Sequence, residues 1–94
     1  MIKRIYKYYI GLGEVSVQMP KDAKPLLMEH QNGSIYLWAL VDTDETVQSW
    51  RRFRYYARGE SFIPETEHIY INTFFTGEDH EFVWHAFELL QENV

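Results

Sequence analysis

The pair Asn32-Gly33 constrains the fold of this chain more than any other feature of the sequence. It separates two runs of strand-prone residues, and a type I′ turn needs positive φ at both central positions, which Asn-Gly adopts readily. The stretch 26–42 therefore predicts a tight β-hairpin. Counting outward from the turn sets the expected cross-strand pairs, which are His30 with Ile35, Met28 with Leu37, and Leu26 with Ala39.

The two faces of this hairpin differ in polarity. The face expected to lie against a core carries Leu26, Met28, Leu37, Ala39 and Val41, whereas the opposite, amphipathic face carries Leu27, Glu29, Tyr36 and Trp38. Side chains alternate along a strand, so a slip of one residue would exchange the faces. The turn therefore also determines the register at the centre of the domain.

Other segments rich in aromatic and β-branched residues are predicted as strands, namely 2–10, 15–19, 50–58 and 67–75, with a loop or a short helical turn at 43–49. Segment 81–90 fits two structures. Its Trp, Val and Phe content favours a strand, whereas Thr76-x-x-Asp79 resembles a helix capping box. We predict a single β-rich domain over residues 1–94. Its fold class is all-β, an antiparallel sandwich or partly open barrel of about six to seven strands, with a short C-terminal helix as the alternative for its end.

Composition argues against several classes of function. The chain has no cysteine, so disulfides and thiolate chemistry are excluded. Its four histidines lack the close spacing of metal ligands, and Gly11-x-Gly13 lacks the third glycine of a dinucleotide fingerprint. No nucleophile stands in a recognisable elbow motif. We therefore expect neither an enzyme nor a metal site nor a cofactor.

Charge is divided unevenly along the chain. The net charge is −5, which argues against duplex DNA as a partner. Residues 1–58 hold all nine Lys and Arg against six acids, and residues 59–94 hold eight acids and no Lys or Arg. This division favours a dipolar surface unless folding interleaves the halves. Pairing of free sheet edges, or of the two charged halves, could then form a homo-oligomer.

The strand expected at 50–58 is the best candidate for a binding site. Alternation places Trp50, Arg52, Arg54, Tyr56 and Arg58 on one face. Guanidinium groups bind phosphate through two hydrogen bonds and aromatic rings stack on bases, so this face suits a nucleotide or another small anion. The same arginines could instead pair with the acidic second half and lie over aromatic rings as structural contacts.

Five blocks of the sequence together resemble a family of small uncharacterised proteins of bacteriophages and prophages. They are Ile5 to Tyr8, Met19 to Lys24, Gln31 to Asp42, Arg51 to Phe53, and Val83 to Glu88. The most specific are Leu-Trp-Ala-Leu-Val-Asp at 37–42 and Val-Trp-His at 83–85. One difference is Ala57-Arg58-Gly59, where family members often have Gly-Thr-Gly. The resemblance implies a phage origin and action in the host cytoplasm, but it supplies no activity and no site.

The sequence thus supports a non-enzymatic phage protein of the host cytoplasm as our leading hypothesis. It would counteract host defence by binding a small anionic ligand, such as a nucleotide, on the Arg/aromatic strand. The alternatives are an inhibitor that binds a host protein through a sheet edge or an acidic surface, and a minor virion or assembly component. The chain has no apolar run of 18 residues and no apolar signal-peptide region, so no membrane partner is expected.

Overall fold

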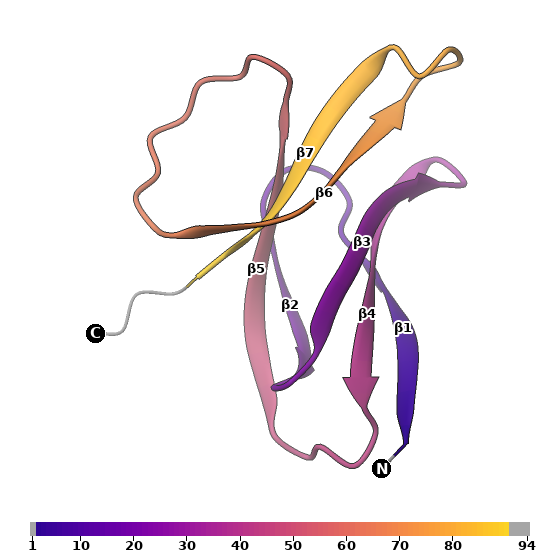
Figure 1. The fold of residues 1–94 in the computed structure, drawn as a ribbon, viewed down its shortest axis with the longest axis vertical. Coiled ribbons are helices and arrows are strands. Elements are labelled where there is room, and N and C mark those ends of the chain that lie inside the picture. The colour runs from indigo at the N-terminus through magenta and orange to yellow at the C-terminus, as the bar shows by residue number, and fades with distance from the viewer. Residues whose placement is uncertain (1, 91–94) are drawn as a thin grey trace.

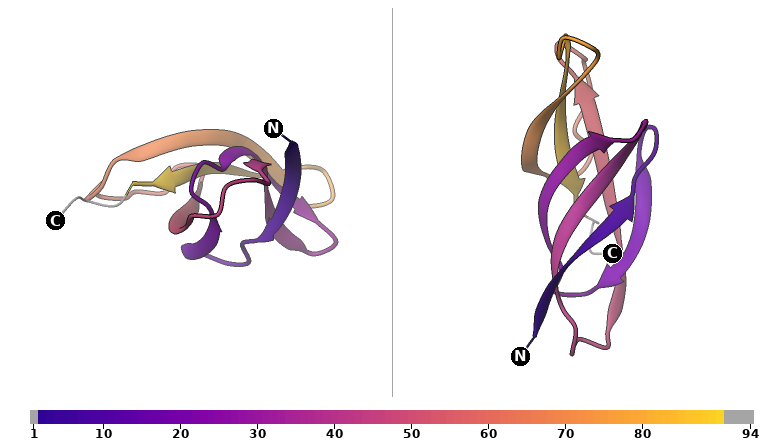
Figure 2. Two further views of the ribbon diagram at one scale, coloured as in Figure 1. Left: turned by 90° about the horizontal axis from the view of Figure 1, so that it is seen from below. Right: turned by 90° about the vertical axis from the view of Figure 1, so that its right-hand side faces the viewer.

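Seven antiparallel strands form two sheets in the computed structural model, which describes residues 2–90 (Figure 1). The strands are β1 (Lys3–Tyr9), β2 (Val15–Pro20), β3 (Lys24–Gln31), β4 (Ser34–Asp42), β5 (Gln48–Ala57), β6 (His68–Thr76) and β7 (Phe82–Leu89). One sheet has the order β1-β4-β3 and the other the order β2-β5-β7-β6. The predicted all-β class is confirmed, and the arrangement is a sandwich. It is flattened, with principal extents of 41 × 34 × 16 Å (Figure 2).

The predicted hairpin is the β3–β4 pair. Asn32 has φ 52° and Gly33 has φ 86°, as a type I′ turn requires. The pairs His30 with Ile35 and Met28 with Leu37 are confirmed. The third predicted pair is wrong, because the register shifts between Pro25 and Leu27 and Pro25 lies opposite Ala39.

This register shift moves Leu26 out of the core. A β-bulge adds one residue to a strand and breaks the alternation of its side chains. Leu26 is accordingly 39% exposed, whereas Met28 and Leu37 are fully buried. Proline cannot donate a ladder hydrogen bond, which fits the position of Pro25 at this irregularity on an edge strand.

The core lies between the two sheets. Its largest fully buried side chains are Met19, Met28, Leu37, Val41, Phe53 and Phe74. Ile35, Leu37, Ala39 and Val41 alternate with half-buried residues along β4, as the predicted apolar face requires. Within residues 2–90 every fully buried side-chain nitrogen and oxygen atom has a hydrogen-bond partner.

Two segment boundaries and one alternative are corrected by the structure. β5 begins at Gln48, so the predicted loop at 43–49 is shorter, and β5 ends at Ala57, which leaves Arg58 just beyond the strand. The strand favoured for segment 81–90 is confirmed as β7, and the helical alternative is excluded, because pairing with both β5 and β6 satisfies the backbone on two sides. The long loop from β5 to β6 arcs outward on the left of Figure 1.

Candidate functional site

Strand β5 pairs with a different neighbour along each half. Gln48 to Phe53 lie opposite β2, and Arg52 to Ala57 lie opposite β7. Because β2 begins only at Val15, opposite Phe53, the β2-side edge of β5 is not covered by β2 from Arg54 onward. The candidate residues are therefore divided between a paired part of the sheet and an open edge.

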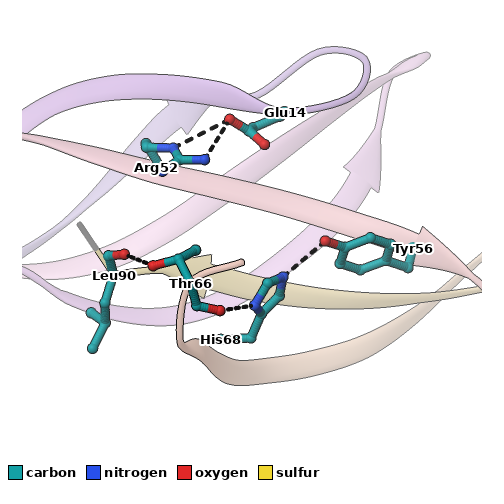
Figure 3. Close-up of polar contacts among 6 residues, drawn as sticks. All are labelled: Glu14, Arg52, Tyr56, Thr66, His68 and Leu90. Carbon is teal, nitrogen blue, oxygen red and sulfur yellow. Dashed lines mark hydrogen bonds and ion pairs between the residues drawn. The ribbon is translucent and has the colours of Figure 1, made fainter. Parts of the chain in front are cut away.

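Arg52 lies on the outer face of its sheet and is bound to a carboxylate. Its Nε and Nη2 both donate to Oε2 of Glu14, at 3.2 and 2.9 Å (Figure 3). The two side chains remain 31% and 40% exposed. Trp50, further along the same face, is 59% exposed and lies opposite Gln18 of β2.

Arg54 contacts one carboxylate and one ring. Its Nη2 lies 3.3 Å from Oε2 of Glu60, and its guanidinium carbon lies 4.5 Å from the centroid of the Tyr56 ring. Oε1 of Glu60 accepts the backbone N–H of Ala57 at 3.0 Å, which holds the carboxylate at the end of β5. Arg54 thus makes the contacts that the sequence analysis gave as the alternative to ligand binding, namely an ion pair with the acidic second half of the chain and a contact with an aromatic ring.

Tyr56 is covered on the outer face. Its ring stacks on Phe62 with a centroid distance of 4.0 Å, and it is only 4% exposed. Its hydroxyl lies 2.8 Å from Nε2 of His68, and Nδ1 of His68 lies 2.8 Å from the carbonyl oxygen of Thr66 (Figure 3). A carbonyl only accepts, so Nδ1 carries the proton, and in the neutral ring Nε2 accepts from Tyr56. Burial raises the pKa of the Tyr56 hydroxyl, and the Arg54 charge opposes this rise.

The loop that covers Tyr56 is held at its far end by the hydroxyl of Thr66, which donates to the carbonyl of Leu90 (Figure 3). The backbone N–H of Leu90 donates to the carbonyl of Glu67 at 2.9 Å. Arg58 begins the loop, where its backbone N–H donates to the carbonyl of Val83 at 3.1 Å and its side chain is exposed. Tyr56 therefore anchors the loop, and in this conformation its ring is not open for stacking on a ligand.

A cleft of about 630 Å³ opens where β5 extends beyond β2. Its lining comes from four places in the chain: the β1–β2 loop, the β3–β4 turn, the end of β5 with Glu60, and the β6–β7 pair at Thr76 and Trp84. Of the five predicted residues, only Arg54 lines it. Tyr9 and Trp84 contribute aromatic walls, and His30 contributes a polar one.

Tyr55 holds the β1–β2 loop at this cleft. Its hydroxyl donates to the carbonyl of Gly11 at 2.7 Å, in a loop where Gly11 and Gly13 both have positive φ. A Cβ at Gly11 would approach within 3.0 Å of the Tyr9 ring, so glycine also permits the tight contact with this wall. Burial raises the pKa of Tyr55, and the Gly13 backbone N–H opposes this rise.

The sequence model of a domain of unknown function, DUF7352, matches residues 1–94. This chain belongs to the DUF7352 family. No curated protein and no solved structure gives a significant match. The function of this DUF7352 protein is therefore inferred from the geometry of its residues.

Among the ion pairs within residues 2–90 of this DUF7352 chain, the most buried one was not expected from the sequence. Nε and Nη2 of Arg51 donate to the two carboxylate oxygens of Glu88, both at 2.7 Å, and its Nη1 donates to the carbonyl of Ala23. The two side chains are 16% and 11% exposed. The alternation of side chains along β5 could have indicated this buried pair, because Arg51 lies on the same face of the strand as the core residues Phe53 and Tyr55.

The described part of the chain, residues 2–90, contains no group of three or more His, Asp or Glu side chains placed to hold a metal ion. Within that part, no helix has the length and apolar character needed to cross a membrane.

Proposed function

We propose that this protein binds a small anionic ligand, such as a nucleotide, in the cleft lined by Arg54, and that it does so without converting it chemically. The observation that carries the proposal is the position of Arg54. Arg54 lines a cleft of about 630 Å³, and ligand pockets commonly measure roughly 300–1,000 Å³.

The contacts of Arg54 leave donors for a ligand. A guanidinium carries five N–H donors, and within residues 2–90 that of Arg54 makes one hydrogen bond, the 3.3 Å contact with Glu60. Both side chains of this pair are 36% exposed, so the contact is weak and water reaches it. A phosphate offers a closer and bidentate match to the same guanidinium.

Glu60 then acts as a competitor for the ligand. Its carboxylate lies beside Arg54 and is held by the backbone of Ala57, so it occupies one guanidinium donor and its charge repels an incoming anion. An aromatic base would find the Tyr9 ring nearby, which is 63% exposed and lines the cleft. The cleft thus combines a cation and an exposed ring, the two groups that a nucleotide needs.

We place this activity in the cytoplasm of a phage-infected cell, following the resemblance to phage proteins. There the protein would sequester a nucleotide signal of a host defence system. Sequestration needs only affinity and abundance, which a small binding protein can supply.

Calorimetric titration with ADP and with a cyclic dinucleotide tests the proposal. Arg54→Ala should weaken binding by about 1.5–3 kcal/mol, the range for a hydrogen bond to a charged group. Arg52→Ala is the matched control, because Arg52 lies on the same strand face and is paired with Glu14 outside the cleft. It should leave binding unchanged.

Glu60→Gln separates ligand binding from a structural role. If Arg54 receives the ligand, this variant should bind more tightly, because the competing charge is gone. If the pair is only structural, Glu60→Gln should lower the melting temperature and no anion should bind to wild type or variant, which would refute the proposal.

A further inference from the structure

The two lateral sides of the sandwich are closed differently. On one side, edge strands β3 and β6 are joined, since the Asn72 amide hydrogen-bonds both the backbone N–H and the C=O of Met28. By the order of the two sheets, β1 and β2 are the edges on the opposite side. Within residues 2–90, β1 pairs only with β4, so its outer edge has no strand beside it (Figure 1).

The hydrogen-bonding direction along β1 follows from its two ends. The N–H of Ile10 donates to the carbonyl of Ile35 at 2.9 Å, and the carbonyl of Ile2 accepts from Thr43 at 3.2 Å. Hydrogen-bonded residues alternate in an antiparallel pair, so the even-numbered residues of β1 bond to β4. The odd-numbered residues Lys3, Ile5, Lys7 and Tyr9 therefore direct their N–H and C=O groups outward.

The charge of this edge selects against a second copy of itself. β1 carries Lys3, Arg4 and Lys7 and no acid. The ion pairs formed within residues 2–90 all involve arginines of β5, so no carboxylate neutralises these three cations by direct contact. Two β1 strands side by side would bring six cations together, and lysines on an edge are a known protection against such pairing.

The side chain of Lys7 lies across β4 and does not block the edge. Its Nζ lies 4.2 Å from the centroid of the Tyr36 ring and donates to Oε1 of Gln31 at 2.6 Å. Beside the open edge stand the exposed side chains of Ile5 and Tyr9, at 60% and 63%. An added strand would lay alternate side chains against them on the outer face.

The other open edge is less suited to receive a strand. β2 has six residues against seven for β1, ends in Pro20, which lacks an N–H, and contains no Lys or Arg. Of these two edge strands, β1 is thus the one that combines basic charge with a row of outward backbone groups.

We propose that β1 binds an acidic, extended segment of another protein as an added strand. The backbone groups of Lys3, Ile5, Lys7 and Tyr9 form the ladder. On the outer face, acidic side chains of the partner lie opposite Lys3 and Lys7, and apolar side chains lie opposite Ile5 and Tyr9. On the other face, one more acidic side chain lies opposite Arg4.

The probe for the test is the capped peptide Val-Thr-Glu-Thr-Val-Glu-Glu, measured by NMR titration. It matches the length of β1 and, in an antiparallel pair, sets Val opposite Tyr9 and Ile5 and Glu opposite the three cations. The N–H groups of Lys3, Ile5, Lys7 and Tyr9 should exchange rapidly in the free protein and slowly with the peptide bound. The N–H groups of Arg4, Tyr6 and Tyr8 should be protected in both states. A binding peptide that leaves the odd-numbered amides unprotected would overturn the proposal.

Ile5→Pro removes one outward N–H without removing a bond to β4, and edge strands tolerate proline. It should weaken binding by about tenfold or more, since a lost hydrogen bond and a blocked ladder act together. Ile5→Ala keeps the N–H and is the matched control, expected to bind more tightly than Ile5→Pro. Equal affinities of the two variants would contradict strand addition.

The charge requirement has its own test, which holds even if Ile5→Pro does not fold. Lys3→Gln with Lys7→Gln should weaken peptide binding, and the same peptide with Lys in place of each Glu should not bind the wild type. Binding of both peptides alike would refute the acidic partner. A homodimer that Ile5→Pro dissociates would replace the proposal with self-pairing of β1.

Discussion

The side-chain amide of Asn72 takes the place of a neighbouring strand for the backbone of Met28. Its Oδ1 accepts the N–H of Met28 at 2.8 Å, and its Nδ2 donates to the C=O of Met28 at 2.9 Å. The register shift between Tyr70 and Asn72 in β6 accompanies this contact. One side chain thus connects an edge of each sheet, at a residue whose own side chain is fully buried in the core.

Asn72→Ala should therefore lower the free energy of unfolding by about 1–3 kcal/mol, because it leaves a partly buried N–H and C=O without partners. Urea denaturation measures this loss. Gln18→Ala is the matched control, since Gln18 is an amide side chain on an exposed position of β2, and it should change stability by less than about 0.5 kcal/mol. Equal effects of the two substitutions would show that the Asn72 contact does not join the sheets.

The ion pair between Arg51 and Glu88 should show the behaviour of a buried pair. Arg51→Ala leaves the Glu88 carboxylate buried and unpaired, so we expect a loss of about 3–5 kcal/mol. Arg52→Ala breaks an exposed pair and should cost less than about 1 kcal/mol. Replacing both partners, Arg51→Met with Glu88→Leu, should restore much of the stability, because no unpaired charge remains. Chemical denaturation of the single and double variants provides the comparison.

The turn between β3 and β4 requires positive φ at Gly33. Gly33→Val should lower the free energy of unfolding by about 1–3 kcal/mol because valine resists the φ of 86°, whereas Gly33→Asn should lower it less, as asparagine tolerates this region.

Leu37→Ala should lower the free energy of unfolding by about 2–5 kcal/mol, because Leu37 is fully buried. Leu26→Ala, at the bulge, should cost less than about 1 kcal/mol. Similar losses at Leu26 and Leu37 would contradict the corrected register.

The fold could be predicted from local signals where these were strong. Asn32-Gly33 determined the turn and the nearest cross-strand pairs, because turn geometry acts over a few residues. The bulge before Leu27 could not be predicted, since it depends on Pro25 at an edge and on packing against the other sheet. The strand within 81–90 was predicted from its Trp, Val and Phe content and is confirmed as β7. Its pairing with both β5 and β6, which excludes the helical alternative, is not contained in any local pattern.

The candidate site could be predicted only in part. Alternation correctly placed Arg52, Arg54 and Tyr56 on one face of a strand. It did not contain their partners, because Glu14 and Glu60 are brought beside β5 by the preceding strand and the following loop. The cleft has walls from four separate parts of the chain, so its existence depends on tertiary structure alone.

The partly buried Tyr8 should make the protein sensitive to alkaline pH. Burial raises its pKa above the ordinary value of 10.0, and the neighbouring Tyr6 adds to the rise. The folded state then holds the proton more tightly than the unfolded state, so this contribution to stability is complete below pH 10.0 and is lost as the pH rises through the higher folded pKa.

The variant Tyr8→Phe has no hydroxyl to ionise at this position, so its free energy of unfolding should fall less steeply than that of wild type above pH 10.0. At neutral pH the two proteins should have similar stability, because within residues 2–90 the Tyr8 hydroxyl makes no side-chain hydrogen bond that the substitution would remove. Urea denaturation at neutral and alkaline pH measures both expectations, and parallel pH profiles would show that Tyr8 ionises as freely in the folded chain as in the unfolded one.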